Sequence, residues 1–334
     1  MKKLNKTVLL AAVLASAANA GVIVGGDATI GLEYLAKSHA SPTHEKMFVV
    51  DGGNSEHGFG HLTFAATDGG KGGNGAYAFV ETFFDLADST SLSTGQTYAG
   101  YNAKKFDVRL GKLDSLTYQW VGSLNEQQLY ADNIAIIPVS NENVNDSIQF
   151  TTKLGSVTLG AGAVLDESTT YDYTTYDLGA KFEVGKLGFS IVHQEANDGI
   201  STTGYLHRNT TSGSLEYAFK NLTSNRFLKD LEAFVTYADY SEQTAAVSSR
   251  QSEDSAYSVG LKLNNNQLLY QTGIRDSQEM MNFQHTRPIS KNTNVGIMAQ
   301  FDTSDYYDFN AAGVQAAAIN RDDEYLGVFI STPF

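Results

Sequence analysis

Three carboxylates lie in one long stretch between two strand-like segments, residues 115–144. They are Glu126, Asp132 and Glu142, and the stretch also holds Trp120 and an apolar run at 134–139. Separate carboxylates can attract cations, whereas hydrolysis would need a nucleophile, a base and an orienting group brought together. Connections this long are uncommon inside compact proteins and are usually functional. This stretch is therefore the first candidate region.

The rest of the sequence offers little for covalent or metal chemistry. There is no cysteine, so disulfides, thiolate ligands and cysteine nucleophiles are excluded. His39, His44 and His57 have no metal-ligand spacing, and no spacing of serine, histidine and acid selects a catalytic triad. The formal net charge of −14 argues against a nucleic-acid partner. We expect no enzyme activity, no metal and no cofactor.

The first twenty residues have the pattern of a secretory signal peptide. Lys2, Lys3 and Lys6 precede an apolar run at 8–17, and Ala20 ends a small-x-small cleavage motif. The apolar run is too short to span a bilayer as a helix. We expect cleavage after Ala20, with residues 1–20 as the signal and residues 21–334 as the exported protein.

Beyond residue 20 the dominant pattern is period-2 alternation, which is typical of β-strands. The alternating apolar residues Ala28, Ile30, Leu32 and Tyr34 are one example, with Thr29, Gly31 and Glu33 between them. Other strands are predicted at 59–66, 156–165, 173–184 and 187–194. Long polar loops are predicted at 37–58, 195–208, 241–254 and 303–321.

The order of turns and loops predicts a transmembrane barrel. Short turns alternate with long polar loops along about sixteen strands, which is the pattern of an outer-membrane barrel. One strand face is apolar or aromatic and the other is polar, whereas a soluble sandwich would turn its apolar faces inward. The predicted fold class is therefore all-β, a transmembrane antiparallel β-barrel of about 16 strands. The loop at 114–145 is then long enough to fold inward as a constriction.

Three segments carry a family resemblance. They are residues 96–101 with 106–115, residues 146–150, and the closing residues 325–334. These segments resemble the general diffusion porins of Gram-negative outer membranes, and the resemblance covers nearly all of the exported chain. It implies a 16-stranded homotrimer in outer-membrane lipid and lipopolysaccharide that passes small hydrophilic solutes and ions. It also implies that the terminal Phe334 is an assembly signal for the barrel-assembly machinery.

Two departures from the family pattern bear on selectivity. The Pro-Glu-Phe-Gly-Gly run of enterobacterial members does not occur between residues 115 and 144. Among the positions that match the family's basic wall cluster, Lys112 and His61 are the basic or titratable ones, whereas Gly31 and Asn143 carry no charge. The resemblance therefore implies a weaker field between wall and loop than in those members.

The candidate pore-lining residues carry more acids than bases. They are Glu33, His61, Glu81, Asp85, Arg109 and Lys112 on strands, with Glu126, Asp132 and Glu142 on the loop. Arg109 and Lys112 have opposite parity, so without a bulge only one faces inward, and the resemblance favours Lys112. Rings of charged side chains set selectivity in pores, so we expect a weak to moderate cation preference.

Two other functions stay open at this stage. Tyr77, Phe79 and Phe83 share the parity of Glu81, and an aromatic track of this kind would suit a substrate-specific channel, for example for sugars. The external loops could alternatively bind a host surface or a phage.

Overall fold

The computed structural model describes residues 21–37, 47–50, 58–67, 74–85, 92–125, 144–164, 167–168, 171–172, 174–197, 205–219, 230–244, 251–273, 279–309 and 315–333. The strands are β1 (Gly21–Lys37), β2 (Met47–Val50), β3 (Gly58–Thr67), β4 (Gly75–Asp85), β5 (Leu92–Asn102), β6 (Phe106–Leu113), β7 (Val144–Leu154), β8 (Val157–Val164), β9 (Glu167–Ser168), β10 (Tyr171–Asp172), β11 (Thr174–Val184), β12 (Leu187–Asn197), β13 (Tyr205–Ala218), β14 (Leu231–Thr244), β15 (Gln251–Leu263), β16 (Asn266–Gly273), β17 (Glu279–Pro288), β18 (Asn294–Phe309) and β19 (Gln315–Pro333). Two short helices, α2 (Leu116–Trp120) and η2 (Gly122–Leu124), lie between β6 and β7. In the described segments no helix has the length and apolar character needed to cross a membrane.

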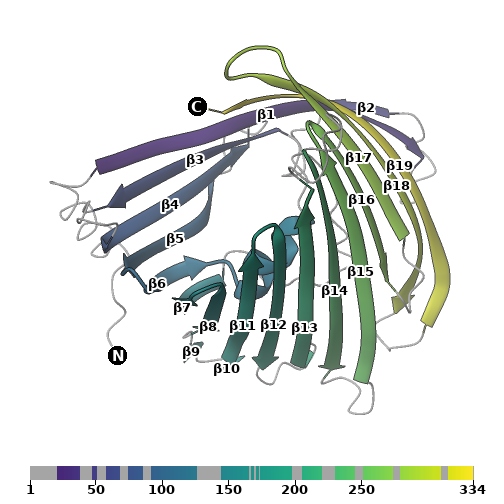
Figure 1. Cartoon of the computed structure of the whole chain (residues 1–334). Coiled ribbons are helices and arrows are strands. Elements are labelled where there is room, and N and C mark those ends of the chain that lie inside the picture. Colours follow the sequence, from purple (N-terminus) through teal and green to yellow (C-terminus); the bar gives the residue numbers. More distant parts are fainter. Residues whose placement is uncertain are drawn as a thin grey trace.

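Sixteen of these strands form a closed antiparallel ring (Figure 1). From β3 to β8 and from β11 to β19 each strand pairs with the next, and β8 pairs with β11. The ring closes because β1 pairs with β3 on one side and with β19 on the other. The short β2 also pairs with β1, beyond the end of the β1–β3 ladder. The predicted all-β barrel of about 16 antiparallel strands is confirmed.

Tight turns join several neighbouring strands at one end of the barrel. Leu154 pairs with Val157 across a two-residue turn, and Val184 pairs with Leu187 in the same way. Gly155 and Gly185 are the first residues of these turns, with φ values of +67° and +64°. Glycine adopts this left-handed conformation without a steric penalty, which explains why it stands at both turns.

The side chains of the ring are arranged inside out. On β11, Leu178 is 54% exposed on the outer face, whereas Asp177 beside it is 5% exposed on the inner face. The large exposed residues of the outer face are apolar or aromatic on nearly every strand from β6 to β19. The buried inner face of the same strands is rich in serine, threonine, glutamine and asparagine. An apolar exterior around a polar interior is the arrangement of a barrel that stands in lipid.

Several strands are longer than the sequence predicted. Residues 195–208, 241–254 and 303–321 were expected to be loops, but strand pairing continues through much of each segment. For example, Tyr240 pairs with Asp254. Hydrophobic alternation requires an apolar solvent on one face, whereas ladder hydrogen bonds do not. The alternation therefore ends before the strands do. The predicted loop at 37–58 likewise contains β2.

A bulge at Gly111 directs the chain from β6 toward the interior. Register shifts between Gly111 and Leu113 in the β6–β7 ladder, and the φ value of Gly111 is +141°. A Cβ atom on Gly111 would lie 2.3 Å from the carbonyl oxygen of Thr97, which is backbone and cannot rotate away. Only glycine fits this backbone conformation without strain.

We expect the substitution Gly111→Ala to lower the free energy of unfolding by about 1–3 kcal/mol, because it imposes both backbone strain and a close contact. The measurement is the heat-induced mobility shift of the detergent-solubilised protein on gels. Gly162→Ala is the matched control, since the nearest atom to its Cβ would be 3.6 Å away. Equal stability of the two variants would contradict the role given to Gly111.

Candidate functional site

The helix α2 lies inside the barrel, against the inner wall formed by β8 and β11 to β13 (Figure 1). Ser115 caps its N-terminus, where the Ser115 Oγ accepts a hydrogen bond of 3.1 Å from the Tyr118 N–H. Leu116, Trp120 and Val121 of this segment form a buried cluster with Val192 of β12. The helix is therefore packed as part of the interior.

Glycines in the wall make room for the indole of Trp120. A Cβ atom on Gly160 would lie 2.7 Å from the Trp120 ring, and one on Gly179 would lie 2.8 Å from it. These two glycines are direct partners on β8 and β11. The indole can lie against the strands because neither position carries a side chain.

Polar contacts anchor the helical segment at its start. The Asp177 carboxylate of β11 accepts a 2.8 Å hydrogen bond from the Leu116 N–H, at the first turn of α2. Its other oxygen accepts a 2.8 Å hydrogen bond from Gln194. A negative side chain is favourable at a helix N-terminus, where N–H groups lack partners within the helix.

Four hydroxyl side chains anchor the end of the segment. Ser190, Ser214, Thr236 and Ser258 are direct cross-strand partners on β12, β13, β14 and β15, and we call them the hydroxyl row. Ser190 and Ser214 donate to the Trp120 carbonyl, over 2.9 and 3.3 Å. Further along the row, Asn125 donates to Thr236 and accepts from Ser258.

The anchors follow the circumference of the barrel. The partners move from β11 to β15 as the chain advances from Leu116 to Asn125. The segment consequently crosses the strands instead of running along them. Sequence reasoning missed this arrangement, although Ser and Thr at alternate positions of consecutive strands were a visible signal.

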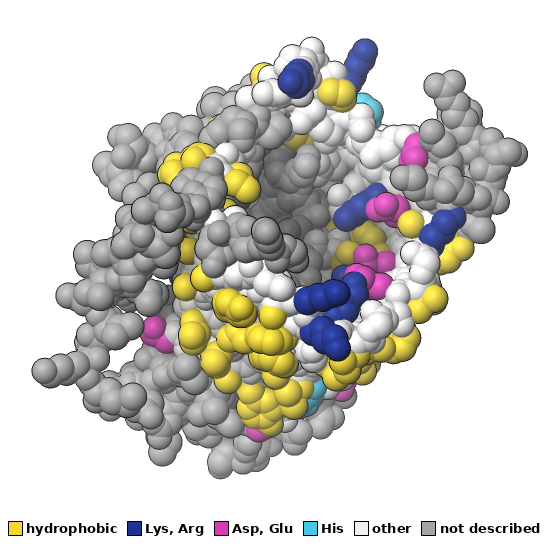
Figure 2. Space-filling view, turned by 60° about the vertical axis from the view of Figure 1, so that its left-hand side comes forward, with side chains coloured by type: hydrophobic (Ala, Val, Ile, Leu, Met, Phe, Trp, Pro, Cys, Tyr) yellow, Lys and Arg dark blue, Asp and Glu magenta, His cyan; other side chains and the backbone are white. Residues whose placement is uncertain are grey.

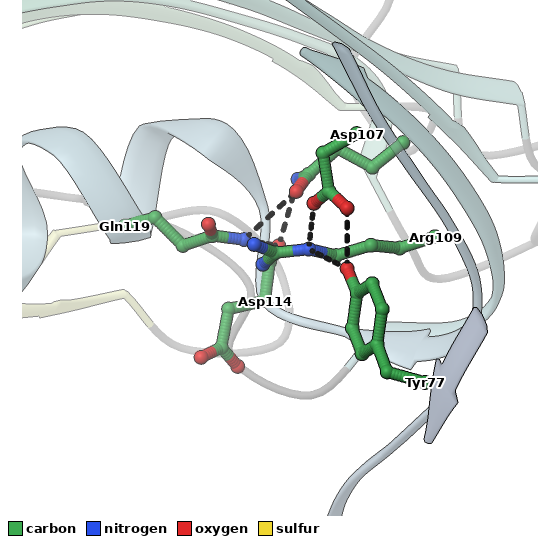
Figure 3. Close-up of polar contacts among 6 residues, drawn as sticks. Tyr77, Asp107, Arg109, Asp114 and Gln119 are labelled. Carbon is green, nitrogen blue, oxygen red and sulfur yellow. Dashed lines mark hydrogen bonds and ion pairs between the residues drawn. The ribbon is translucent and has the colours of Figure 1, made fainter. Parts of the chain in front are cut away.

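A second polar cluster lies on the inner face of β4 and β6 (Figure 3). The Tyr77 hydroxyl donates to Asp107 over 2.6 Å, and the Arg109 Nε donates to the other Asp107 oxygen over 2.7 Å. The Arg109 Nε also donates to the Tyr77 hydroxyl over 3.1 Å. One side of the guanidinium is thus fixed by an acid and a phenol.

This cluster adjoins the base of the inward segment. Arg109 pairs directly with Gln149 of β7. Gln149 donates to the Asp114 carbonyl over 3.3 Å and accepts from Gln119 of α2 over 3.3 Å. In Figure 3 the guanidinium of Arg109 extends from β6 toward the side on which Gln119 lies.

Aromatic rings line the wall next to Arg109. The guanidinium carbon lies 5.5 Å from the centroid of the Tyr98 ring, within the range of a cation–π contact. Tyr98 also contacts Phe79, with centroids 5.3 Å apart, and Tyr77, with centroids 6.1 Å apart. The ring of Tyr77 lies over Gly100, its direct partner on β5.

The predicted strand residues lie on one side of the barrel, from β1 to β6. Glu81 accepts a 2.8 Å hydrogen bond from the Gln96 N–H, at a register shift between β4 and β5. Arg109 faces the interior. Lys112 has the opposite parity beside the Gly111 bulge, and its ammonium donates to the Thr94 carbonyl.

The backbone register places three further predicted positions. Glu33 pairs with Gly327, His61 pairs with Phe83, and Asp85 pairs with Phe59. The predicted loop acids and terminal positions, Glu126, Asp132, Glu142, Ala20 and Phe334, lie outside the described residues. Part of the loop predicted at 114–145 is helical, because α2 and η2 occupy its first residues.

Lysine, arginine and acidic side chains gather along the right-hand side of the hollow on the face seen in Figure 2. By strand alternation, the described inward charges are the acids Glu81, Asp107, Asp177, Glu183, Glu216 and Glu232 and the bases Arg109, Lys153, Lys181 and Lys262. Glu183 forms ion pairs with Lys181 over 3.5 Å and with Lys153 over 3.9 Å. No group of three or more metal-ligating side chains occurs among the residues that the structure describes.

A polar-lined barrel with a segment folded across its interior is the architecture of a porin, and comparison with known families agrees. The model of the Gram-negative porin family matches residues 7–324. The chain belongs to this family. The prediction from the sequence is confirmed, and this porin is an outer-membrane channel protein. Comparison with curated protein sequences gave no significant match.

Solved structures share the fold of this porin at low sequence identity. An anion-selective porin from Comamonas acidovorans is 14% identical, with a TM-score of 0.70 over 94% of this chain and 100% of that chain. The outer membrane protein OmpT of Vibrio cholerae, in its trimer form, is 11% identical, with a TM-score of 0.66 over 94% and 99%. A mutant of Rhodopseudomonas blastica porin is 12% identical, with a TM-score of 0.55 over 94% and 100%. These similarities concern the barrel architecture.

We expect Asp177→Ala to lower the free energy of unfolding by about 1–3 kcal/mol, because it leaves the Leu116 N–H and the Gln194 amide buried without their acceptor. Asp177→Asn is the matched variant, since it keeps one carbonyl acceptor and should lose less. Thermal unfolding in detergent measures the difference. An alanine variant as stable as the unmodified porin would show that the anchor contributes nothing.

Proposed function

We propose that this porin forms a water-filled channel for passive diffusion of small hydrophilic solutes and ions, and that it is not an enzyme. The observation that carries the proposal is the polar inner face together with the segment from Ser115 to Asn125 that is hydrogen-bonded across it. Small hydrophilic solutes can enter a polar lumen whatever their chemical class. The inward segment would then limit the size of the solutes that pass.

A weak to moderate cation preference is part of the proposal. It rests on the acidic composition of the chain and on the excess of acids among the described inward charges. Lys153 and Lys181 form ion pairs with Glu183, and Lys262 is the direct cross-strand partner of Glu232, which reduces the effect of these lysines on anions. The Comamonas acidovorans porin is described as anion-selective, so the wall charges of this chain have to be tested directly.

The measurement is the reversal potential of the channel in planar bilayers with a KCl gradient. We expect the sign of this potential to show that potassium permeates faster than chloride. The preference should weaken as the salt concentration rises, because the Debye length shortens from about 10 Å at 0.1 M to about 3 Å at 1 M. A potential of the opposite sign would refute the cation preference while leaving the channel function intact.

A substrate-specific channel, for example for sugars, is the second candidate. The cluster of Tyr77, Phe79 and Tyr98 on the inner face of β4 and β5 favours it, because aromatic faces can stack on sugar rings. A general channel instead sorts solutes by mass alone.

Swelling of proteoliposomes in sugars of graded size separates these two candidates. We expect the swelling rate to fall smoothly with sugar mass and to rise linearly with sugar concentration. A rate that saturates for one sugar and not for others of equal mass would favour the specific channel.

The proposal extends to export and assembly. Residues 1–20 would direct export, and Phe334 would be read by the barrel-assembly machinery. The channel would work as a homotrimer, as the trimer form of the Vibrio cholerae protein suggests. Outer-membrane lipid and lipopolysaccharide would surround it. Chemical crosslinking in outer membranes tests the trimer.

A further inference from the structure

The guanidinium of Arg109 is only partly used by its neighbours. Its Nε donates to Asp107 and to Tyr77, whereas Nη1 and Nη2 form no hydrogen bond with any residue in the described segments. The side chain is 29% exposed. The outer edge of the partly exposed guanidinium thus carries N–H donors on the side toward Gln119, at the base of the inward segment (Figure 3).

The neighbours hold this edge in one orientation. The Nε contacts fix the guanidinium plane from one side, and the Tyr98 ring lies 5.5 Å from its central carbon. Tyr77 in turn holds Asp107. A fixed group loses little conformational entropy when it binds a partner. The cluster therefore preorganises an arginine fork.

A fork of parallel N–H donors matches a carboxylate, which accepts two hydrogen bonds side by side. A dianion fits less well here. Asp107 neutralises part of the guanidinium charge, and Glu81 shares the inner face of β4 with Tyr77. A second negative charge would therefore be repelled. The acids nearby favour a monoanion with one carboxylate.

We propose that Arg109 forms a binding subsite for small monocarboxylates inside the channel, next to the base of the inward segment. The subsite rests on the proposed function, because solutes reach it only through a water-filled lumen. It makes the passage of monocarboxylates saturable, whereas neutral solutes of the same size pass without saturation.

Uptake of radiolabelled gluconate and glucose by proteoliposomes tests the subsite, since the two solutes have similar size and only gluconate carries a carboxylate. We expect gluconate uptake to saturate with a half-saturation concentration on the order of millimolar. Unlabelled lactate should compete with it, and glucose uptake should rise linearly. Linear gluconate uptake would overturn the subsite, and equal competition by inorganic phosphate would overturn its restriction to monocarboxylates.

Two substitutions separate the fork from the charge. Arg109→Lys keeps the charge without the fork and should raise the half-saturation concentration about tenfold, while Arg109→Gln should abolish saturation. Lys104→Gln, in the exposed turn between β5 and β6, removes the same charge and should change nothing. Unchanged half-saturation in Arg109→Lys would refute the fork. Glucose uptake in the same vesicles reports folding and the channel itself, so its loss would count against the proposed function.

Discussion

Backbone hydrogen bonding in lipid is the constraint on which this structure depends. Hydrocarbon offers no partner to a free N–H or C=O group, and each unsatisfied group costs several kcal/mol. The sixteen-strand ring satisfies the ladder groups because β1 pairs with β19. Closure also creates two environments, so each strand must present an apolar face to lipid and a polar face to the lumen. The inside-out burial of β11 follows from this.

The polar inner face then decides how a segment can pack against it. Trp120 needs Gly160 and Gly179, which lack side chains, to approach the wall. The polar contacts use short side chains of the hydroxyl row or a carboxylate already on a strand. Glycine weakens a strand interior, and serine is not among the residues that favour strands. Their presence at these wall positions is explained by the segment that they accommodate.

The sequence was sufficient to predict the fold because successive residues of each strand face lipid and water in turn, so that apolar and polar residues alternate along the strand. The two-residue turn at Gly185 could also be located, between the strands predicted at 173–184 and 187–194, because its left-handed conformation favours glycine. Strand ends could not be located, because alternation stops where both faces contact water. The packing of α2 could not be predicted either, since five residues carry no usable helical period.

The sequence was also insufficient to predict which charged side chains face the interior. Strand alternation indicates that the side chains of Arg109 and Lys112 point to opposite faces of the sheet, but it does not indicate which of the two faces inward. That outcome depends on the strand as a whole and on the Gly111 bulge beside Lys112. The partners of Arg109 come from β4, β5 and β6, and no local pattern joins them before the strands are aligned.

The pairing of β1 with β19 has a consequence for biogenesis. Asp27 is paired with Pro333, so the ladder that seals the ring joins segments from opposite ends of the chain. Contacts of such long sequence separation form late, because the entropy of closing the intervening loop opposes them. Until the C-terminal strand arrives, every precursor exposes two strand edges that can pair with other chains. A chain truncated before the last strand would therefore leave an open sheet edge that can pair with other chains.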